Sequence, residues 1–300
     1  MKIVLTGASG FLGSHLARRF VDDGHTVVVG VRGSTSLDRV GDFLDRMELV
    51  DLDQRGIGGL FEGSPPPHAV VHTATRYGRA EKEASEVYES NVLFPMELVK
   101  QAADNKVRNF INTDTFYPRN YGPLYAYASS KGQFSQWGRA QVKNRGGRFI
   151  NLRLQHLYGP DDREDKFIPF LIESCLKRVP EIPLTEGTQK RDFIYISDAV
   201  QAYVEMLENL DVLPEGYLHF DIGTGTSVSV RHLAEKIRAA TRSDSVLLFG
   251  DLPLQEGELM DSKANTANLR EMGWEPLVSL DEGIARTIQY FSGKHRGDGK

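Results

Sequence analysis

A tyrosine and a lysine four residues apart have the types and spacing of a proton-transfer pair. Tyr127 and Lys131 enclose the sequence Ala-Ser-Ser, and helical spacing continues through Phe134 and Trp137. Side chains at positions i and i+4 of a helix share one face. A nearby ammonium favours the phenolate, so we expect Tyr127 to exchange a proton near neutral pH. Chance places Tyr and Lys at this spacing in many proteins, and the pair gains weight only from its surroundings.

Two threonines precede this pair at the end of an apolar run. The run 109–112 continues as Thr113-Asp114-Thr115. In a doubly wound sheet the carboxyl ends of the strands carry the ligand-binding residues. Thr113 is therefore the predicted hydrogen-bond donor to a reacting oxygen. Two alternatives stay open: turn or capping hydrogen bonds by both threonines, and contact of Thr115 with the substrate.

A glycine-rich loop near the start of the chain predicts a dinucleotide site. Gly7, Gly10 and Gly13 follow a strand pattern and open a helical one. The first glycine permits a sharp turn, the second lets the backbone approach a pyrophosphate, and the third lets helix and strand pack closely. Lys131 would then also hold the nicotinamide ribose. A tight turn without a ligand is the alternative.

The end of the next strand favours NADP(H) over NAD(H). A NAD site carries an acid there for the ribose hydroxyls, whereas this chain has Val31 followed by Arg32. Val31 removes the carboxylate that would repel a 2′-phosphate, and Arg32 brings a guanidinium that binds one. Asp51 and Leu52, after the third strand, are placed to meet the adenine edge.

The elements that must position these residues alternate between strand and helix. Strand patterns at 3–5, 27–29, 69–71, 110–111 and 149–154 alternate with helical patterns such as 11–21 and 87–103. This alternation predicts an α/β fold: a Rossmann-type doubly wound parallel sheet with a smaller C-terminal α/β lobe. We expect the NADP-binding domain to comprise 1–155 and about 190–222, and the second lobe 156–189 and 223–300. Ser229 is the expected N-cap of a helix in that lobe.

Composition excludes several classes of protein. With 36 basic and 41 acidic residues the net charge is -5, and no basic run suggests nucleic-acid binding. The single cysteine, Cys175, rules out an internal disulfide or a thiolate metal cluster, and we expect no metal site. The sequence lacks a secretory leader and an apolar stretch long enough to span a membrane, so we expect a cytoplasmic protein.

With these residues assembled, the chain resembles the extended short-chain dehydrogenase/reductases, the NAD-dependent epimerase/dehydratase family, over nearly its full length. Beyond the glycine loop and the Tyr-Lys pair, the resemblance rests on 70–74, Asn91, Arg153, 158–160, 191–195, 220–223 and 272–274. It implies a Rossmann lobe that binds NADP(H), a smaller lobe that grips a nucleoside-diphosphate sugar, and a nicotinamide that faces the hexose between them.

The resemblance also implies roles for individual residues. Those implied as catalytic are Thr113, Tyr127 and Lys131. Those implied to contact the cofactor are Gly7, Ser9, Gly10, Phe11, Leu12, Gly13, Arg32, Asp51, Leu52, Thr73, Ala74, Asn91, Tyr127 and Lys131. Those implied to contact the substrate are Thr115, His156, Lys166, Phe167 and Arg191, the last through a phosphate or the ribose. A lone histidine at the end of a strand is more often structural, and that interpretation of His156 stays open.

Departures from the family pattern narrow the reaction. In the family's 4,6-dehydratases an Asp-Glu pair after the catalytic threonine performs elimination, but here Thr115 follows Asp114. Val31 and Arg32 favour an exchangeable NADPH that is consumed in each turnover. We therefore predict NADPH-dependent reduction of a keto group, at C4, of a nucleoside-diphosphate 4-keto-6-deoxyhexose, as in nucleotide-sugar 4-keto reductases. Gln255 stands where many relatives have a phosphate-binding arginine, so the base of the nucleotide stays open.

Two other functions remain in view. A nucleotide-sugar 4-epimerase would keep the fold and consume no cofactor. A non-catalytic NADP-binding regulator would need the glycine loop but not the proton donor. The family also suggests a homodimer through the helix patterns around Val87 and Phe134, although an ordinary core explains those apolar residues equally well.

Overall fold

The alternating apolar runs of the first half of the chain form a parallel sheet. The structure, a computed structural model, describes residues 1–78 and 83–297. The strand order is β3-β2-β1-β4-β5-β6-β11, and every pair from β3 to β6 is parallel. The strands are β1 (Lys2–Thr6), β2 (Thr26–Val31), β3 (Glu48–Asp51), β4 (Ala69–His72), β5 (Asn109–Thr115), β6 (Arg148–Leu154) and β11 (Gly216–Ile222). The predicted Rossmann-type fold class is confirmed, with β1 at the point where the strand order reverses.

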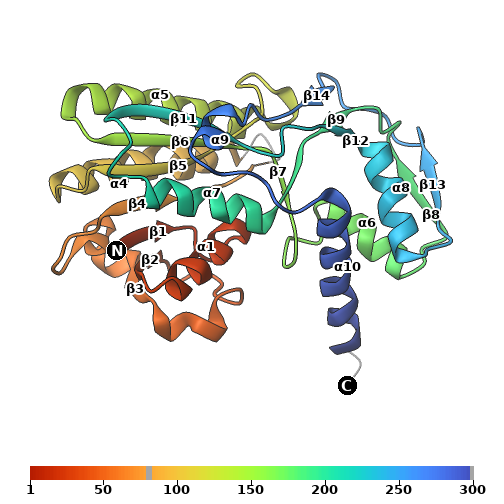
Figure 1. Ribbon diagram of the computed structural model, residues 1–300, viewed down its shortest axis with the longest axis horizontal. Helices are drawn as coiled ribbons and strands as arrows, with labels where there is room; N and C mark the ends of the chain where they lie inside the picture. Colours follow the sequence, from red (N-terminus) through yellow and green to blue (C-terminus); the bar gives the residue numbers. More distant parts are fainter. Residues whose placement is uncertain (79–82, 298–300) are drawn as a thin grey trace. The chain divides into compact units, whose positions relative to one another are not determined.

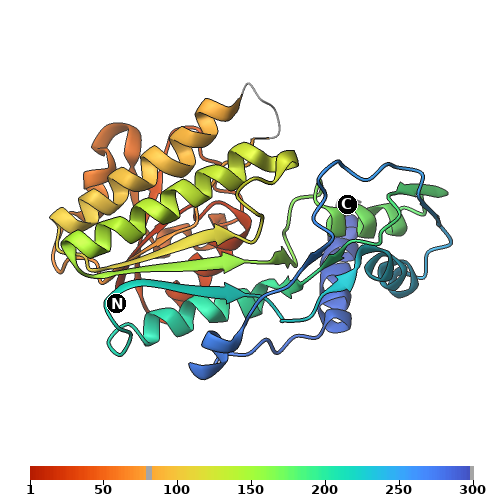
Figure 2. The same cartoon turned by 90° about the horizontal axis from the view of Figure 1, so that it is seen from above.

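Helices cover both faces of this sheet. α4 and α5 lie on one face and α7 on the other (Figures 1 and 2). α1 neighbours α7, since the Arg19 guanidinium donates to Gln201 Oε1 at 2.9 Å. The helices among these strands are α1 (Phe11–Asp22), η1 (Gly41–Arg46), α2 (Leu52–Arg55), η2 (Ile57–Phe61), α3 (Ala84–Tyr88), η4 (Glu89–Leu93), α4 (Phe94–Asp104), η5 (Gly122–Leu124), α5 (Tyr125–Arg145) and α7 (Ile196–Glu208).

The helical pattern expected over 87–103 is divided into three pieces. α3 passes into η4, a single π-helical turn, before α4 begins. A π-turn inserts one residue into the helical repeat and frequently marks a functional site. Asn91 lies in this turn and is buried, with 1% of its surface exposed.

α5 packs closely against the sheet because it carries a glycine there. A Cβ on Gly138 would come within 2.2 Å of the Phe149 ring in β6. Phe134, in the preceding turn, is fully buried and packs on Phe110 and Phe149. Trp137 is partly buried against the same core. The two aromatic residues of the helical pattern after Lys131 thus contribute to the core of this chain.

The second half of the chain adds short strands and helices. Its strands are β7 (His156–Tyr158), β8 (Glu181–Leu184), β9 (Lys190–Arg191), β10 (Phe193–Tyr195), β12 (Val228–Ser229), β13 (Val246–Phe249) and β14 (Asp261–Ser262). Its helices are α6 (Phe167–Leu176), α8 (Val230–Thr241), α9 (Ala267–Glu271) and α10 (Leu280–Gly297). The strands form three small sheets, β10-β7, β12-β9-β14 and β13-β8. Ser229 caps α8 as predicted, its hydroxyl accepting the His232 N–H at 3.1 Å.

The contacts divide the chain into two compact units. One comprises residues 1–154 and 200–220, and the other 155–199 and 221–300. Residues 190–199, which the sequence analysis placed with the first domain, fall in the second unit because β10 pairs with β7. Among the described residues no helix combines the length and apolar character needed to cross a membrane.

Candidate active site

The glycine loop between β1 and α1 is a tightly interlocked turn. A Cβ on Gly13 would lie 1.9 Å from the Gly7 carbonyl oxygen, so helix and strand meet here without room for a side chain. Gly7 has a φ of +80°, and a Cβ there would lie 2.5 Å from the Ala74 nitrogen and 2.7 Å from the Thr73 hydroxyl. Ala74 and Thr73 therefore adjoin the loop directly. The structure brings these predicted cofactor residues together.

The start of α1 is suited to an anion. The first N–H groups of a helix have no carbonyl one turn before them and carry the positive end of the dipole. Neither a capping side chain nor an acidic residue of the first turn occupies them. Ser9, Phe11 and Leu12 surround this position, as predicted for a pyrophosphate site. These residues fit a dinucleotide.

Asn91 fastens the wall beside this loop. Its amide nitrogen donates to the Arg76 carbonyl at 2.8 Å and to the Ser130 hydroxyl at 3.1 Å. Its amide oxygen accepts from the Arg76 N–H at 2.9 Å and from the Thr75 hydroxyl at 3.3 Å. All four hydrogen-bonding positions of the amide are thus filled by the protein. Asn91 joins the loop after β4 to α5, so any effect on a cofactor passes through its neighbours.

The end of β2 carries an exposed cation, and a second arginine accompanies it. Arg32 is exposed, with its guanidinium 5.6 Å from the centre of the Phe94 ring. Arg39 donates to the Ser9 carbonyl at 3.4 Å and so reaches the glycine loop. Sequence reasoning missed Arg39 because its place beside Ser9 depends on the path of the loop after β2. The nearby Asp51 caps α2, accepting from the Asp53 N–H at 2.9 Å.

The predicted proton-transfer pair lies in the first turns of α5, buried against β5. Tyr127 is 6% and Lys131 2% exposed. The Lys131 ammonium donates to the Thr113 carbonyl at 2.9 Å. Burial raises the pKa of the Tyr127 phenol well above its usual value, and Tyr77 adds to this. Burial therefore keeps Tyr127 a protonated phenol, contrary to the expectation that the neighbouring ammonium brings its pKa towards neutrality.

The two threonines of β5 have different partners. The Thr113 hydroxyl pairs with the buried Tyr203 hydroxyl of α7 at 2.7 Å. The Thr115 hydroxyl hydrogen-bonds Tyr127 and thereby lowers the pKa of the phenol, although burial prevails. Thr113 therefore contributes its carbonyl to Lys131, while Thr115 places its hydroxyl at the reactive tyrosine.

One aromatic ring packs on the tyrosine, and three more lie in the loop after β5. Tyr77, from the loop after β4, stacks on Tyr127 with ring centres 4.5 Å apart. In the loop after β5, the Tyr117 ring stacks on Tyr121 with centres 4.7 Å apart and meets Phe116 at a tilt with centres 4.1 Å apart. Sequence reasoning did not select these rings, because Tyr77 and Tyr127 become neighbours only when the sheet forms.

Four of the five predicted substrate residues lie in the second unit. Burial, together with the positive charges of Arg191 and Lys166, lowers the pKa of His156 to about 3, so the imidazole is neutral. Lys166 is the N-cap residue of α6, and Phe167 begins that helix. Arg191, 4% exposed, is paired with Glu258, an acid that sequence reasoning missed. The fifth predicted residue, Thr115, belongs to the first unit.

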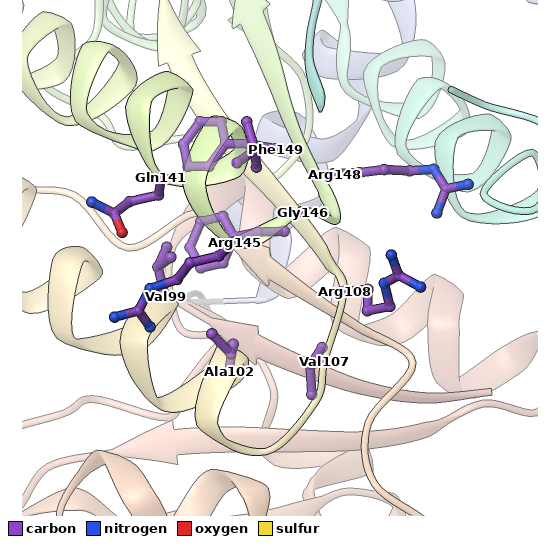
Figure 3. A pocket seen from close by; sticks show the side chains of 12 residues that line it. Val99, Ala102, Val107, Arg108, Gln141, Arg145, Gly146, Arg148 and Phe149 are labelled. Carbon is purple, nitrogen blue, oxygen red and sulfur yellow. The ribbon is translucent and has the colours of Figure 1, made fainter. Parts of the chain in front are cut away.

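A small cavity of about 40 Å³ lies elsewhere in the first unit. It sits at the amino ends of β5 and β6, with Arg108, Arg145 and Arg148 beside it (Figure 3). The residues predicted to do chemistry lie at the carboxyl end of β5 and in the first turns of α5. This cavity is therefore not the candidate active site. In the described part of the chain, no His, Cys, Asp and Glu side chains are grouped to hold a metal ion.

Comparison with known proteins identifies a family and several relatives of this chain. Residues 3–223 match the model of the NAD-dependent epimerase/dehydratase family. CDP-abequose synthase of Salmonella muenchen is 33% identical over 291 residues, which cover 96% of this chain and 97% of that protein. dTDP-4-dehydro-6-deoxyglucose reductase of Escherichia coli is 33% identical over 174 residues, 56% of this chain and 52% of that protein.

Solved structures share the fold. UDP-glucose 4-epimerase of Thermotoga maritima superposes with a TM-score of 0.86 at 23% identity, covering 98% of this chain and 100% of that one. The dTDP-glucose 4,6-dehydratase of Streptomyces venezuelae gives 0.84 at 23% identity, covering 99% and 98%. Together with the glycine loop and the buried Tyr127 and Lys131, the match over residues 3–223 shows that the chain belongs to the NAD-dependent epimerase/dehydratase family.

Proposed function

We propose that this chain uses NADPH to reduce the C4 keto group of a nucleoside-diphosphate 4-keto-6-deoxyhexose, a step in deoxysugar synthesis. Support comes from the names of two relatives, a CDP-abequose synthase and a dTDP-4-dehydro-6-deoxyglucose reductase, each 33% identical over its matched region. Both names refer to nucleotide-linked deoxysugars, and the second names the reduction of a 4-dehydro-6-deoxy sugar.

The observation that carries the proposal is the state of Tyr127. Its pKa is raised by burial, so the phenol holds its proton, and the Thr115 hydroxyl hydrogen-bonds it. Reduction of a carbonyl needs a proton donor at the oxygen that becomes an alkoxide. A buried, protonated phenol with a second hydroxyl beside it supplies that donor.

The residues of the chain then have distinct roles. Bound NADPH would supply hydride to C4. Tyr127 would give its phenolic proton to the carbonyl oxygen, while Thr115 donates a hydrogen bond to that oxygen as negative charge develops. The carbonyl carbon gains hydride and the oxygen gains the proton, so the product is an alcohol. Lys131, anchored on the Thr113 carbonyl, would stabilise the phenolate left behind and hold the nicotinamide ribose.

The remaining predicted residues bind. Arg32 and Arg39 are proposed to hold the 2′-phosphate of NADPH, because a guanidinium forms paired hydrogen bonds with phosphate oxygens. Arg191 and Lys166 are proposed to bind the sugar diphosphate, with the neutral His156 beside them. The Arg191–Glu258 pair would have to rearrange or share its guanidinium when the diphosphate binds.

A spectrophotometric assay tests this proposal. Purified protein is mixed with NADPH or, in parallel, NADH, and with CDP-, dTDP-, GDP- and UDP-linked 4-keto-6-deoxyhexoses in turn. Oxidation of NADPH with one sugar, lost in Tyr127→Phe, supports the reductase and identifies its nucleotide. NADPH that binds tightly yet is oxidised with none of the sugars would contradict it.

A 4-epimerase is the second candidate. A UDP-glucose 4-epimerase of Mycolicibacterium smegmatis is 26% identical over 326 residues, and the fold matches the Thermotoga maritima epimerase. An epimerase returns the hydride to the opposite face of the sugar and leaves the cofactor unchanged. Interconversion of two sugar nucleotides without loss of NADPH would favour it over the reductase.

A further inference from the structure

Asp114, between the two threonines, is a buried carboxylate whose hydrogen bonds are saturated. Its side chain has 0% exposure. Arg119 donates to both oxygens, at 2.8 and 2.5 Å. Asn151 donates to Oδ2 at 2.8 Å, and the Thr115 N–H donates to Oδ1 at 2.8 Å. Every one of these partners is a donor, so both carboxyl oxygens are fixed in place by the protein.

The side chain of Arg119 packs against α5 at a position occupied by glycine, Gly132. A Cβ on Gly132, the residue after Lys131 in α5, would lie 2.6 Å from Arg119 Cδ and 2.9 Å from its Nε. Glycine inside a helix costs about 1 kcal/mol relative to alanine. The space gained at Gly132 is filled by the Arg119 side chain, which crosses α5 beside the active-site lysine.

A continuous set of contacts leads from this arginine to the tyrosine. Arg119 holds the Asp114 carboxylate, and that carboxylate holds the Thr115 N–H. The Thr115 hydroxyl accepts from the Tyr117 N–H at 3.3 Å, and its interaction with the Tyr127 phenol lowers the pKa of that phenol. Thr115 is the last residue of β5 and still pairs with Leu154 of β6. The pairing with β4 ends at Asn112, so on that side its N–H is bonded by the Asp114 side chain.

The geometry points to Arg119 and Gly132 as positioning residues that act through Asp114 to hold Thr115 on Tyr127. Neither Arg119 nor Gly132 needs to touch the sugar for this role. The kinetic part of the inference rests on the proposed reductase function.

Gly132→Ala is the sharpest test, because it adds one methyl group and removes no charge. The new Cβ displaces Arg119, and we expect kcat to fall about 10- to 100-fold, the effect of a small misplacement of reacting groups. KM for the sugar nucleotide and Kd for NADPH should change less than about twofold. Gln136→Ala, at an exposed position of the same helix, is the matched control and should keep kcat.

Arg119→Met and Arg119→Lys form the second arm. Removing the guanidinium should lower kcat as in Gly132→Ala, and lysine, with its charge but no fork, should restore part of it. Arg145→Met, which removes an exposed charge near the end of α5, is the control. A rise in KM with unchanged kcat would instead mean that Arg119 binds substrate and would overturn the positioning role.

Amide hydrogen exchange separates this inference from the proposed function. The Thr115 N–H is protected by Asp114 in the wild type, and exchange should quicken at least 10-fold in Gly132→Ala and Arg119→Met but not in the controls. If the wild type reduces no keto sugar, the proposed function fails while this measurement still decides the role of Arg119. Unchanged exchange at Thr115 in both variants would refute the inference.

Discussion

Lys131 is an ammonium inside the protein, and its burial has a cost. It is 2% exposed, and burial lowers its pKa from 10.5 to about 8. The difference between these values corresponds to about 3 kcal/mol of stability. The folded chain binds this proton less tightly than the unfolded chain does. The penalty is therefore complete below about pH 8 and disappears as the pH rises towards 10.5.

Replacing Lys131 should therefore lower the activity of the protein and raise its stability. We expect Lys131→Met to lower kcat at least about 100-fold, since the phenolate loses its cation. The same variant should be up to about 3 kcal/mol more stable at pH 7, less the lost hydrogen bond to Thr113. Chemical denaturation at several pH values measures this, and the gain should shrink between pH 8 and 10.5. Lys143→Met, at an exposed position of α5, is the control. A gain in stability that does not depend on pH would contradict this explanation.

The two threonines of β5 allow a direct comparison. Thr115 hydrogen-bonds Tyr127, whereas the hydroxyl of Thr113 pairs with Tyr203. Thr115→Val should lower kcat by about 100-fold, the effect of losing one donor to a developing oxyanion. Thr113→Val keeps the carbonyl that holds Lys131. Its loss of kcat should therefore be at least about tenfold smaller than the loss in Thr115→Val. Steady-state kinetics of both variants decides, and equal losses would return Thr113 to the role predicted from the sequence.

The sequence could not choose between these threonines. Residues two apart in a strand point to the same face, so the period of β5 treats Thr113 and Thr115 alike. The residue that distinguishes them is Tyr203, whose hydroxyl pairs with that of Thr113. It lies in α7, far along the chain. The same limit hid Arg119, whose place depends on a bare position in α5. The turn from β1 into α1 and the cap at Ser229 were predictable because each is formed by residues close in sequence.

At the scale of elements, the loop after β2 is expected to choose the cofactor. Arg32 and Arg39 should each contribute a charge-assisted hydrogen bond to a 2′-phosphate, worth about 1.5 to 3 kcal/mol. Arg32→Ala and Arg39→Ala should thus weaken NADPH binding roughly 10- to 100-fold. NADH binding should stay the same, because it has no phosphate there. Calorimetric titration with both dinucleotides measures the two effects, and an equal loss for NADH would show that these arginines bind something else.

We expect Asn91, which lies in the π-turn η4, to contribute to the stability of the fold. Asn91→Leu would remove the side-chain partners of the Arg76 N–H and carbonyl, while the Ser130 hydroxyl would keep its bond to the Tyr127 carbonyl. Each buried polar group left unpaired costs about 1 to 3 kcal/mol, so we expect a loss of about 2 to 4 kcal/mol. Thermal or urea unfolding measures it. Asn91→Asp, which retains the acceptor, should lose less. A variant as stable as the wild type would show that water replaces the amide.

At the scale of the whole molecule, the predicted binding residues are distributed over both units. The predicted dinucleotide residues lie in residues 1–154, and the predicted diphosphate residues His156, Lys166 and Arg191 lie in the other unit. Arg191→Met should therefore raise KM for the sugar nucleotide about 10- to 100-fold. Its NADPH dissociation constant should not change. Glu258→Gln, which removes the competing anion, should lower KM, and the opposite shift would mean that Glu258 itself binds the sugar nucleotide.

The fully bonded amide of Asn91 bears on how this protein can be redesigned. Because every donor and acceptor of this side chain is already used, a substitution there would disturb both the loop after β4 and α5. In the loop after β2, by contrast, Arg32 is exposed. We therefore expect that cofactor preference can be changed at Arg32 and Arg39, while the buried contacts of Asn91 are left as they are.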